Sequence, residues 1–231
     1  RVYEGAMTLL LIPGFMADAT LWDGMTDDLA PFGPLVATDL SQGEDIERMA
    51  AAILADAPER FVAVGFSMGG WMATELAAIA RERFDKLVLI APAGLNDPAH
   101  PATPLGGITP QDFPGYLTHD PAVAARFFPD GSDPAFAEAF GADRAREGDL
   151  VGRLCAPFGM GHPNLRRFMA RITNPTLLVW GERDGLLPAS QAPIWLENLP
   201  AAQLLSVPDT GHLVPQERPE TLKAIGDFLA A

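Results

Sequence analysis

Residues 64–70 read VGFSMGG and place one serine between glycines, at a change from strand-like to helix-like sequence. An apolar run, residues 61–64, precedes the serine, and residues 68–84 carry apolar side chains at helical spacing. Glycine and serine are common in ordinary turns between a strand and a helix. The same order is also typical of a nucleophile elbow, G-x-S-x-G, in which a sharp turn exposes the serine hydroxyl. The rest of the chain decides between these interpretations.

The composition narrows the class of protein. With 231 residues the chain is long enough for one domain with a core of ordinary size. Its net charge of -14 argues against nucleic acid and anionic membranes as partners, because both require clustered basic residues. The longest apolar runs are far shorter than the roughly 20 residues that span a bilayer. Since Cys155 is the only cysteine, neither an intrachain disulfide nor a thiolate metal cluster is possible. We therefore expect a cytoplasmic protein whose oligomeric state the sequence does not determine.

Apolar runs of strand type alternate with segments of helical period along most of the chain. This alternation predicts βαβ units, and continuously apolar strands indicate a sheet that is covered on both faces. We thus expect an α/β fold with a mostly parallel, doubly wound sheet of about six strands. The predicted strands are residues 7–12, 35–38, 61–64, 87–90, 176–180 and 203–207; the predicted helices are residues 21–29, 46–57, 68–84, 189–199 and 219–229.

The alternation stops between Leu95 and about Arg171. This part of the chain holds seven of the 13 phenylalanines and has no β-rich run, while helical pieces are predicted at residues 134–140 and 164–172. We expect residues 95–172 to form an inserted helical lid, and residues 1–94 and 173–231 to form the core. An apolar lid would line a substrate pocket. The candidate pocket residues are Phe113, Phe127, Phe128, Phe158 and His162, although a histidine beside glycine and proline is more often an ordinary loop residue.

A serine hydroxyl is a poor nucleophile near neutral pH and needs a general base, which in turn needs an orienting group. Of four histidines, three lie in the predicted lid, whereas His212 follows the last predicted strand. Asp184 follows the strand at residues 176–180, so Ser67, Asp184 and His212 are all expected at the carboxyl edge of the sheet. Asp209, three residues before His212, is the alternative acid, but its position is more typical of a turn.

Four segments carry a resemblance to a known family. LLLIPGF (residues 9–15), VGFSMGG (64–70), LLVWGERDGLLP (177–188) and VPDTGHLVPQERPE (207–220) resemble the sequence blocks of the α/β-hydrolase family in order and spacing. The resemblance implies a catalytic triad of Ser67, Asp184 and His212. It also implies an oxyanion hole formed by the backbone N–H groups of Met68 and Phe15, with Met16 as the alternative to Phe15.

The sequence departs from the family pattern in two places. Pro13 stands where the family usually has histidine, which a hole made of backbone donors tolerates. Only six residues precede Met7, whereas the family commonly has two further strands there. Either the sheet is smaller in this member or the chain is trimmed.

The resemblance implies a serine hydrolase that cleaves a small, largely apolar carboxylic ester through an acyl-enzyme, with no metal and no organic cofactor. A lactonase, a carbon–carbon bond hydrolase, a perhydrolase and an acyltransferase use the same triad and stay open as alternatives. A haloalkane dehalogenase is disfavoured, because that family has aspartate where Ser67 stands. A non-catalytic binding protein of the same fold is the alternative from another class, and the presence of all three triad residues argues against it.

Overall fold

The computed structural model describes residues 7–14, 19–38, 46–109, 111–129, 132–155 and 160–231. At its centre is a six-stranded sheet with the strand order β2-β1-β3-β4-β7-β8, in which every neighbouring pair is parallel. This confirms the predicted sheet. The strands are β1 (Thr8–Ile12), β2 (Leu35–Ala37), β3 (Phe61–Phe66), β4 (Phe84–Ile90), β7 (Thr176–Gly181) and β8 (Ala202–Val207).

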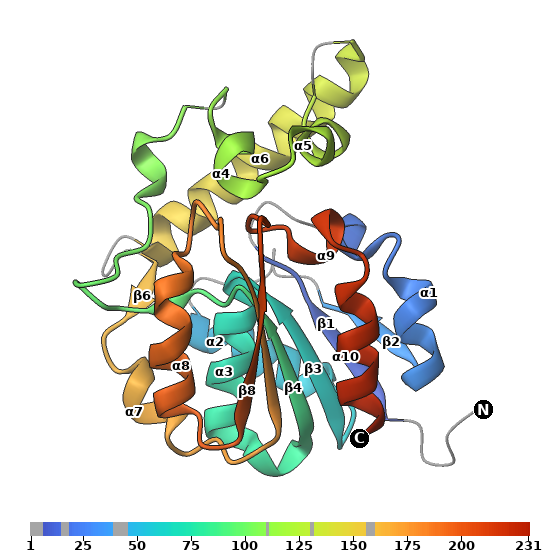
Figure 1. Ribbon diagram of the computed structural model, residues 1–231, viewed down its shortest axis with the longest axis vertical. Helices are drawn as coiled ribbons and strands as arrows, with labels where there is room; N and C mark the ends of the chain where they lie inside the picture. The colour runs from blue at the N-terminus through green and yellow to red at the C-terminus, as the bar shows by residue number, and fades with distance from the viewer. Residues whose placement is uncertain (1–6, 15–18, 39–45, 110, 130–131, 156–159) are drawn as a thin grey trace.

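Helices cover the sheet on both faces, as the continuously apolar strands predicted. Helices α2 and α3 pack together on one side, while α1 and α10 pack together on the other (Figure 1). The helices of the core are α1 (Thr26–Leu29), α2 (Ile46–Asp56), α3 (Met68–Ala80), α8 (Ala192–Asn198), α9 (Val214–Glu217) and α10 (Thr221–Ala230). Every residue of β3 and of β7 is buried, so these strands form the middle of the core.

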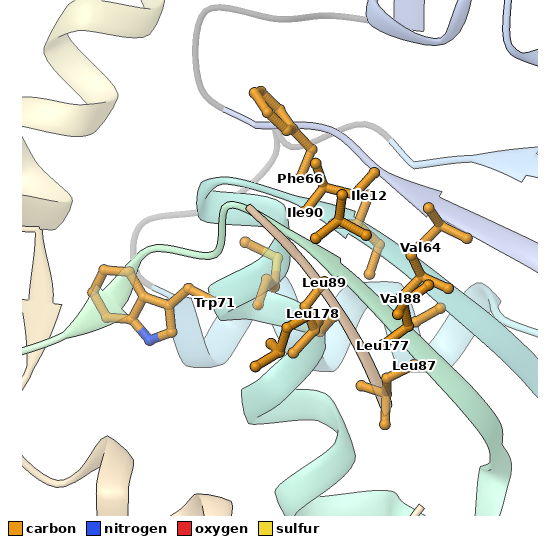
Figure 2. Close-up of a cluster of buried hydrophobic side chains, with 14 of the residues drawn as sticks. Ile12, Val64, Phe66, Trp71, Leu87, Val88, Leu89, Ile90, Leu177 and Leu178 are labelled. Carbon is orange, nitrogen blue, oxygen red and sulfur yellow. The ribbon is translucent and has the colours of Figure 1, made fainter. Parts of the chain in front are cut away.

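Figure 2 shows the apolar side chains of the central strands gathered between sheet and helices, with Ile12, Val64 and Leu87 among them. Trp71 joins this cluster from α3 and is 3% exposed. Apolar area removed from water stabilises the fold by about 25 cal/mol per Å². Burial of these side chains therefore stabilises the positions of the strands. The loops that follow the strands start from these fixed carboxyl ends.

The first helical segment differs from the expected one, because glycine and proline interrupt the pattern there. The helix expected at residues 21–29 is a 3₁₀ turn (Ala19–Trp22) followed by the short α1. Gly24 lies between them with a φ of 80°, a conformation that glycine adopts without strain and that ends a helix. A second 3₁₀ turn (Ala30–Phe32) follows α1, with proline in its first turn.

Residues 95–172, called the insertion from here on, connect β4 to β7 and lie largely beyond the end of the sheet (Figure 1). They contain a 3₁₀ turn (Leu105–Gly107), α4 (Phe113–Leu117), α5 (Pro121–Phe127), α6 (Pro134–Cys155) and α7 (Leu165–Met169). Helix α6 continues 15 residues beyond the segment expected to be helical. No helix in the part of the chain that the structure describes is long and apolar enough to cross a membrane.

One small sheet in this region was not expected from the sequence. Strands β5 (Gly94–Leu95) and β6 (Gly161–His162) run parallel, with Gly94 opposite Gly161 and Leu95 opposite His162. The pair joins the start of the insertion to its later part. Two residues are too short a run to give a strand pattern, which is why the sequence indicated no strand here.

Candidate active site

Ser67 lies at the junction of β3 and α3, and its backbone is held in an unusual conformation. Its φ is 53° and its ψ is -118°, which is outside the favoured regions for a residue with a side chain. Its N–H donates to the carbonyl of Ile90 at 2.9 Å, and its carbonyl accepts from the N–H of Ala93 at 2.9 Å. Such a conformation costs of order 1–3 kcal/mol and persists only when surrounding structure enforces it. The turn around Ser67 thus has the geometry of a nucleophile elbow.

The glycines beside Ser67 allow three backbone segments to approach one another. A Cβ on Gly69 would overlap the carbonyl oxygens of Ile12 and Pro13, at the end of β1. A Cβ on Gly65 would lie 2.6 Å from the carbonyl oxygen of Gly69. Only glycine fits at these positions, so the G-x-S-x-G spacing follows from close packing of β1, β3 and α3.

The segment after β1 passes directly beside the serine. A Cβ on Gly14 would lie 2.9 Å from the Cβ of Ser67. Met68 is the first residue of α3, and the first N–H groups of a helix have no partner within the helix. Its N–H is therefore suited to an oxyanion. The other predicted donor, Phe15, and its alternative, Met16, lie outside the described residues.

Asp184 and His212 are in direct contact and completely enclosed. His212 Nδ1 and Asp184 Oδ2 are 2.7 Å apart, and the exposed fractions of the two side chains are 1% and 0%. The second carboxylate oxygen, Oδ1, accepts from the N–H groups of Leu186 and Leu187, both at 2.9 Å. Three donors thus fix the carboxylate. In a neutral imidazole whose Nδ1–H donates to Oδ2 of Asp184, Nε2 is left as the proton acceptor.

His212 lies in the loop between β8 and α9. Its ring is 4.8 Å from the ring of Phe66, the residue immediately before Ser67, and is tilted 51° to it. The loops after β3, β7 and β8 therefore bring the three predicted residues to one edge of the sheet. Ser67 is 6% exposed there.

Asp209, the alternative acid, occupies a different environment. Its side chain is 65% exposed and its Oδ1 lies 3.4 Å from Nε of Arg183. Its backbone φ of 45° is a turn conformation that aspartate tolerates better than most residues. His212 therefore has Asp184 as its carboxylate partner, and Asp209 is a turn residue.

The histidines of the insertion make other contacts. His100 Nδ1 lies 2.9 Å from Oγ of Ser190. The ring of His162, a candidate pocket residue, stacks on Phe168 with centroids 5.6 Å apart, and its Nδ1 accepts from the N–H of Asn164.

The insertion forms a partly open cavity of about 850 Å³. Two of the predicted pocket residues, Phe113 and Phe128, line it, and their ring centroids are 6.2 Å apart. Phe127 does not line this cavity; its ring lies 5.8 Å from the guanidinium carbon of Arg126. Phe158 lies outside the described residues. Among the described residues the lining comes entirely from the insertion and includes neither Ser67 nor His212.

Several residues of this cavity were not identified from the sequence. They are aliphatic or aromatic side chains without periodic spacing: Leu105, Ile108, Phe140 and Val151. The high phenylalanine content pointed to the region, but no local signal separated lining side chains from exposed ones such as Phe136, which is 41% exposed. No sequence pattern indicated that the acidic residue Glu217 is buried.

Comparison with known proteins defines the family. Residues 9–225 match the alpha/beta hydrolase family, and the chain belongs to that family. The resemblance seen in the four sequence segments is thereby confirmed.

Two curated relatives match nearly the whole chain. The pimeloyl-[acyl-carrier protein] methyl ester esterase of Vibrio campbellii is 28% identical, over 88% of this chain and 87% of its own length. The uncharacterized hydrolase YugF of Bacillus subtilis is 28% identical over 97% of this chain and 90% of its own length. Among solved structures, a bacterial membrane phospholipase A superimposes with a TM-score of 0.81 and 26% identity, covering 99% of this chain and 80% of the other. The protein is thus an alpha/beta hydrolase with esterase-like relatives.

Proposed function

We propose that this protein is a serine hydrolase that cleaves a small, largely apolar carboxylic ester through an acyl-enzyme. The observation that carries the proposal is the enclosed 2.7 Å contact between His212 and Asp184, beside the strained turn at Ser67. A buried carboxylate that orients an imidazole next to a serine on a sharp turn is the arrangement that activates a hydroxyl. The esterase-like relatives support the same reaction class.

In the acylation step, Oγ of Ser67 attacks the carbonyl carbon of the ester while Nε2 of His212 takes the hydroxyl proton. Asp184 stabilises the resulting imidazolium through Nδ1–H and keeps the ring in the required tautomer. Negative charge develops on the carbonyl oxygen, where the N–H of Met68 donates. One such donor is worth on the order of 10² to 10³ in rate. The C–O bond then breaks, and the leaving alkoxide takes the proton from His212.

In the deacylation step, a water molecule attacks the acyl carbon while His212 removes one of its protons. Collapse of the second tetrahedral intermediate breaks the bond to Ser67 Oγ, which regains its proton from His212. The products are the carboxylic acid and the free enzyme. The roles of Phe15 as second oxyanion donor and of Phe127, Phe158 and His162 as substrate contacts stay predictions.

We further propose that the insertion is a lid over this site and that its cavity receives the acyl chain. Support comes from the residues that line the cavity, among them Phe113, Phe128 and Phe140, which offer an apolar wall of the size typical for small-molecule pockets. A chain bound there would be removed from water. Specificity for the acyl part would therefore depend on the insertion and not on the core.

Two measurements test the proposal. A fluorophosphonate probe should label the protein stoichiometrically, and Ser67→Ala should not be labelled. A panel of p-nitrophenyl esters of increasing chain length, run beside lactones, should show turnover of esters with a chain-length optimum. Failure of the wild-type protein to react with the probe would make it a binding protein of this fold, and preference for lactones would replace the ester assignment.

A further inference from the structure

Glu217, at the end of α9, places a buried carboxylate between two parts of the chain that are distant in sequence. The residue is 6% exposed. Its Oε1 accepts from the N–H of Gly211 at 2.9 Å, and its Oε2 accepts from the N–H of Asp120 at 3.0 Å. The N–H of His119 lies 3.2 and 3.1 Å from the two oxygens. One carboxylate thus binds three backbone donors, one from the core and two from the insertion.

The core donor belongs to the loop that carries the proposed general base, because Gly211 immediately precedes His212. The fit at Gly211 is tight: a Cβ there would lie 2.7 Å from Oε1 of Glu217 and 2.9 Å from the carbonyl oxygen of Leu117. Only glycine allows the carboxylate to approach this loop so closely.

The same loop is attached to the insertion a second time. The N–H groups of His212 and Leu213 both donate to the carbonyl of Leu117, at 2.9 and 3.0 Å. Leu117 ends α4, and His119 and Asp120 lie between α4 and α5. The backbone of His212 is therefore held from the insertion, while its ring is held from the core by Asp184.

Two guanidinium groups donate hydrogen bonds to backbone carbonyls of the same short helix, α9. Nη2 of Arg126, from α5, donates to the carbonyl of Gln216 at 3.1 Å, and Nη1 of Arg218 donates to the carbonyl of Glu217 itself at 3.0 Å. A carboxylate has acceptors only, so it matches three N–H donors without an unpaired group. The contacts of Glu217 join α9, the loop of His212 and the segment between α4 and α5 into one hydrogen-bonded unit.

We propose that Glu217 is a positioning residue for His212 and that it couples the placement of the insertion to the alignment of the imidazole with Ser67. The proposal rests on the proposed function and adds a residue that acts through His212 without touching substrate. Loss of either arm would let the loop of His212 shift relative to Asp184 and Ser67. A misplacement of about 1 Å in a catalytic group can cost about 100-fold in rate.

The test uses Glu217→Gln in the full chain. The amide keeps the shape but replaces one acceptor oxygen by an NH₂ donor, which must face a backbone N–H of either Gly211 or the 119–120 segment. Glu220→Gln is the matched control, since it makes the same chemical change at an exposed residue three positions away. Glu217→Asp keeps both acceptor oxygens on a side chain one methylene shorter.

The readouts are the acylation rate with p-nitrophenyl acetate, measured in the pre-steady-state burst and normalised to titrated active sites, its KM, and the melting temperature. We expect Glu217→Gln to lower the acylation rate about 10- to 100-fold with KM changed less than about threefold. Glu217→Asp should recover part of the loss, and Glu220→Gln should equal the wild-type protein.

A Glu217→Gln protein with a lower melting temperature but a wild-type acylation rate per active site would make Glu217 a purely structural brace and overturn the proposal. Should Glu217→Gln fail to fold, the rate of Glu217→Asp decides in the same way: a reduced rate supports the proposal, and a wild-type rate refutes it. An inactive wild-type protein would instead contradict the proposed function, so the two failures are distinguishable.

Discussion

The carboxyl edge of the core and the insertion meet at the candidate site, but they are packed in opposite ways. Around Ser67 backbone meets backbone, and a single added methyl group at Gly69 would overlap the end of β1. In α6 of the insertion, a methyl group added at Gly141, Gly148 or Gly152 would meet no other segment within 4 Å, and these glycines line the 850 Å³ cavity. The proposed reacting groups are tightly packed, whereas space is left where we propose that the substrate binds. Four predictions test this contrast.

The largest effect is expected in the core, from Ser67→Ala. Loss of the hydroxyl removes attack and proton transfer together, because the members of such a site act as one unit. We expect ester turnover to fall by about 10⁴-fold or more with an unchanged melting temperature, measured with p-nitrophenyl acetate and by thermal unfolding. A variant that keeps a tenth of the wild-type turnover would rule out Ser67 as nucleophile.

A comparable loss is expected from His212→Gln, and it separates the core histidine from those of the insertion. A general base must be neutral, so kcat/KM of the wild-type protein should fall on the acid side through one ionisation. His212→Gln should remove nearly all activity. The matched variants His100→Gln, His119→Gln and His162→Gln should keep both the activity and the acid limb. Loss of the limb in His162→Gln alone would move the base into the insertion.

The same substitution should have opposite effects on stability in the two regions. Gly69→Ala forces an overlap with the backbone of β1 and should lower the free energy of unfolding by about 1–3 kcal/mol or more. Gly148→Ala places a methyl group in open space on α6 and should be neutral or raise stability by up to about 1 kcal/mol, since alanine favours helix. Denaturant titration measures both. Equal losses would show that the insertion is packed as tightly as the core.

The smallest effect is expected from Phe128→Ala, which enlarges the cavity of the insertion. The preferred acyl chain length should shift, with a change of a few-fold in kcat/KM for long esters and little change for the acetate ester. Phe136→Ala is the control, because Phe136 is 41% exposed and does not line the cavity. An unchanged length preference in Phe128→Ala would leave the acyl-pocket proposal without support.

The sequence predicted the core well, because its signals are local. Continuous apolar runs such as that of β3 can be satisfied only by a sheet covered on both faces, and the elbow glycines mark a close backbone approach. Asp184 and His212 each follow a strand, so a parallel sheet brings them to the same edge as Ser67. Asp184 and His212 are in contact in the structure, while their catalytic roles stay predictions.

The insertion and the contacts across it could not be predicted in the same detail. The full length of α6 was missed because its middle, residues 143–149, is mostly charged and interrupts the apolar pattern. The β5–β6 pair is too short to leave a pattern. The contacts of Glu217 could not be predicted from the sequence for another reason. A buried acidic side chain depends on donors that lie 97 and 98 positions away in the chain, which no local signal reveals.

The small β5–β6 pair bears on how the insertion can vary in evolution. Because Gly94 lies opposite Gly161, the chain leaves the core and returns toward it at neighbouring points. Everything between those points resembles a long loop with its ends held together, and the cost of closing a loop rises only slowly with its length. Such a segment can be lengthened, shortened or replaced as a unit while the six-stranded sheet of the core is retained. Recombination at this junction could then change the insertion and leave the proposed catalytic residues of the core unchanged.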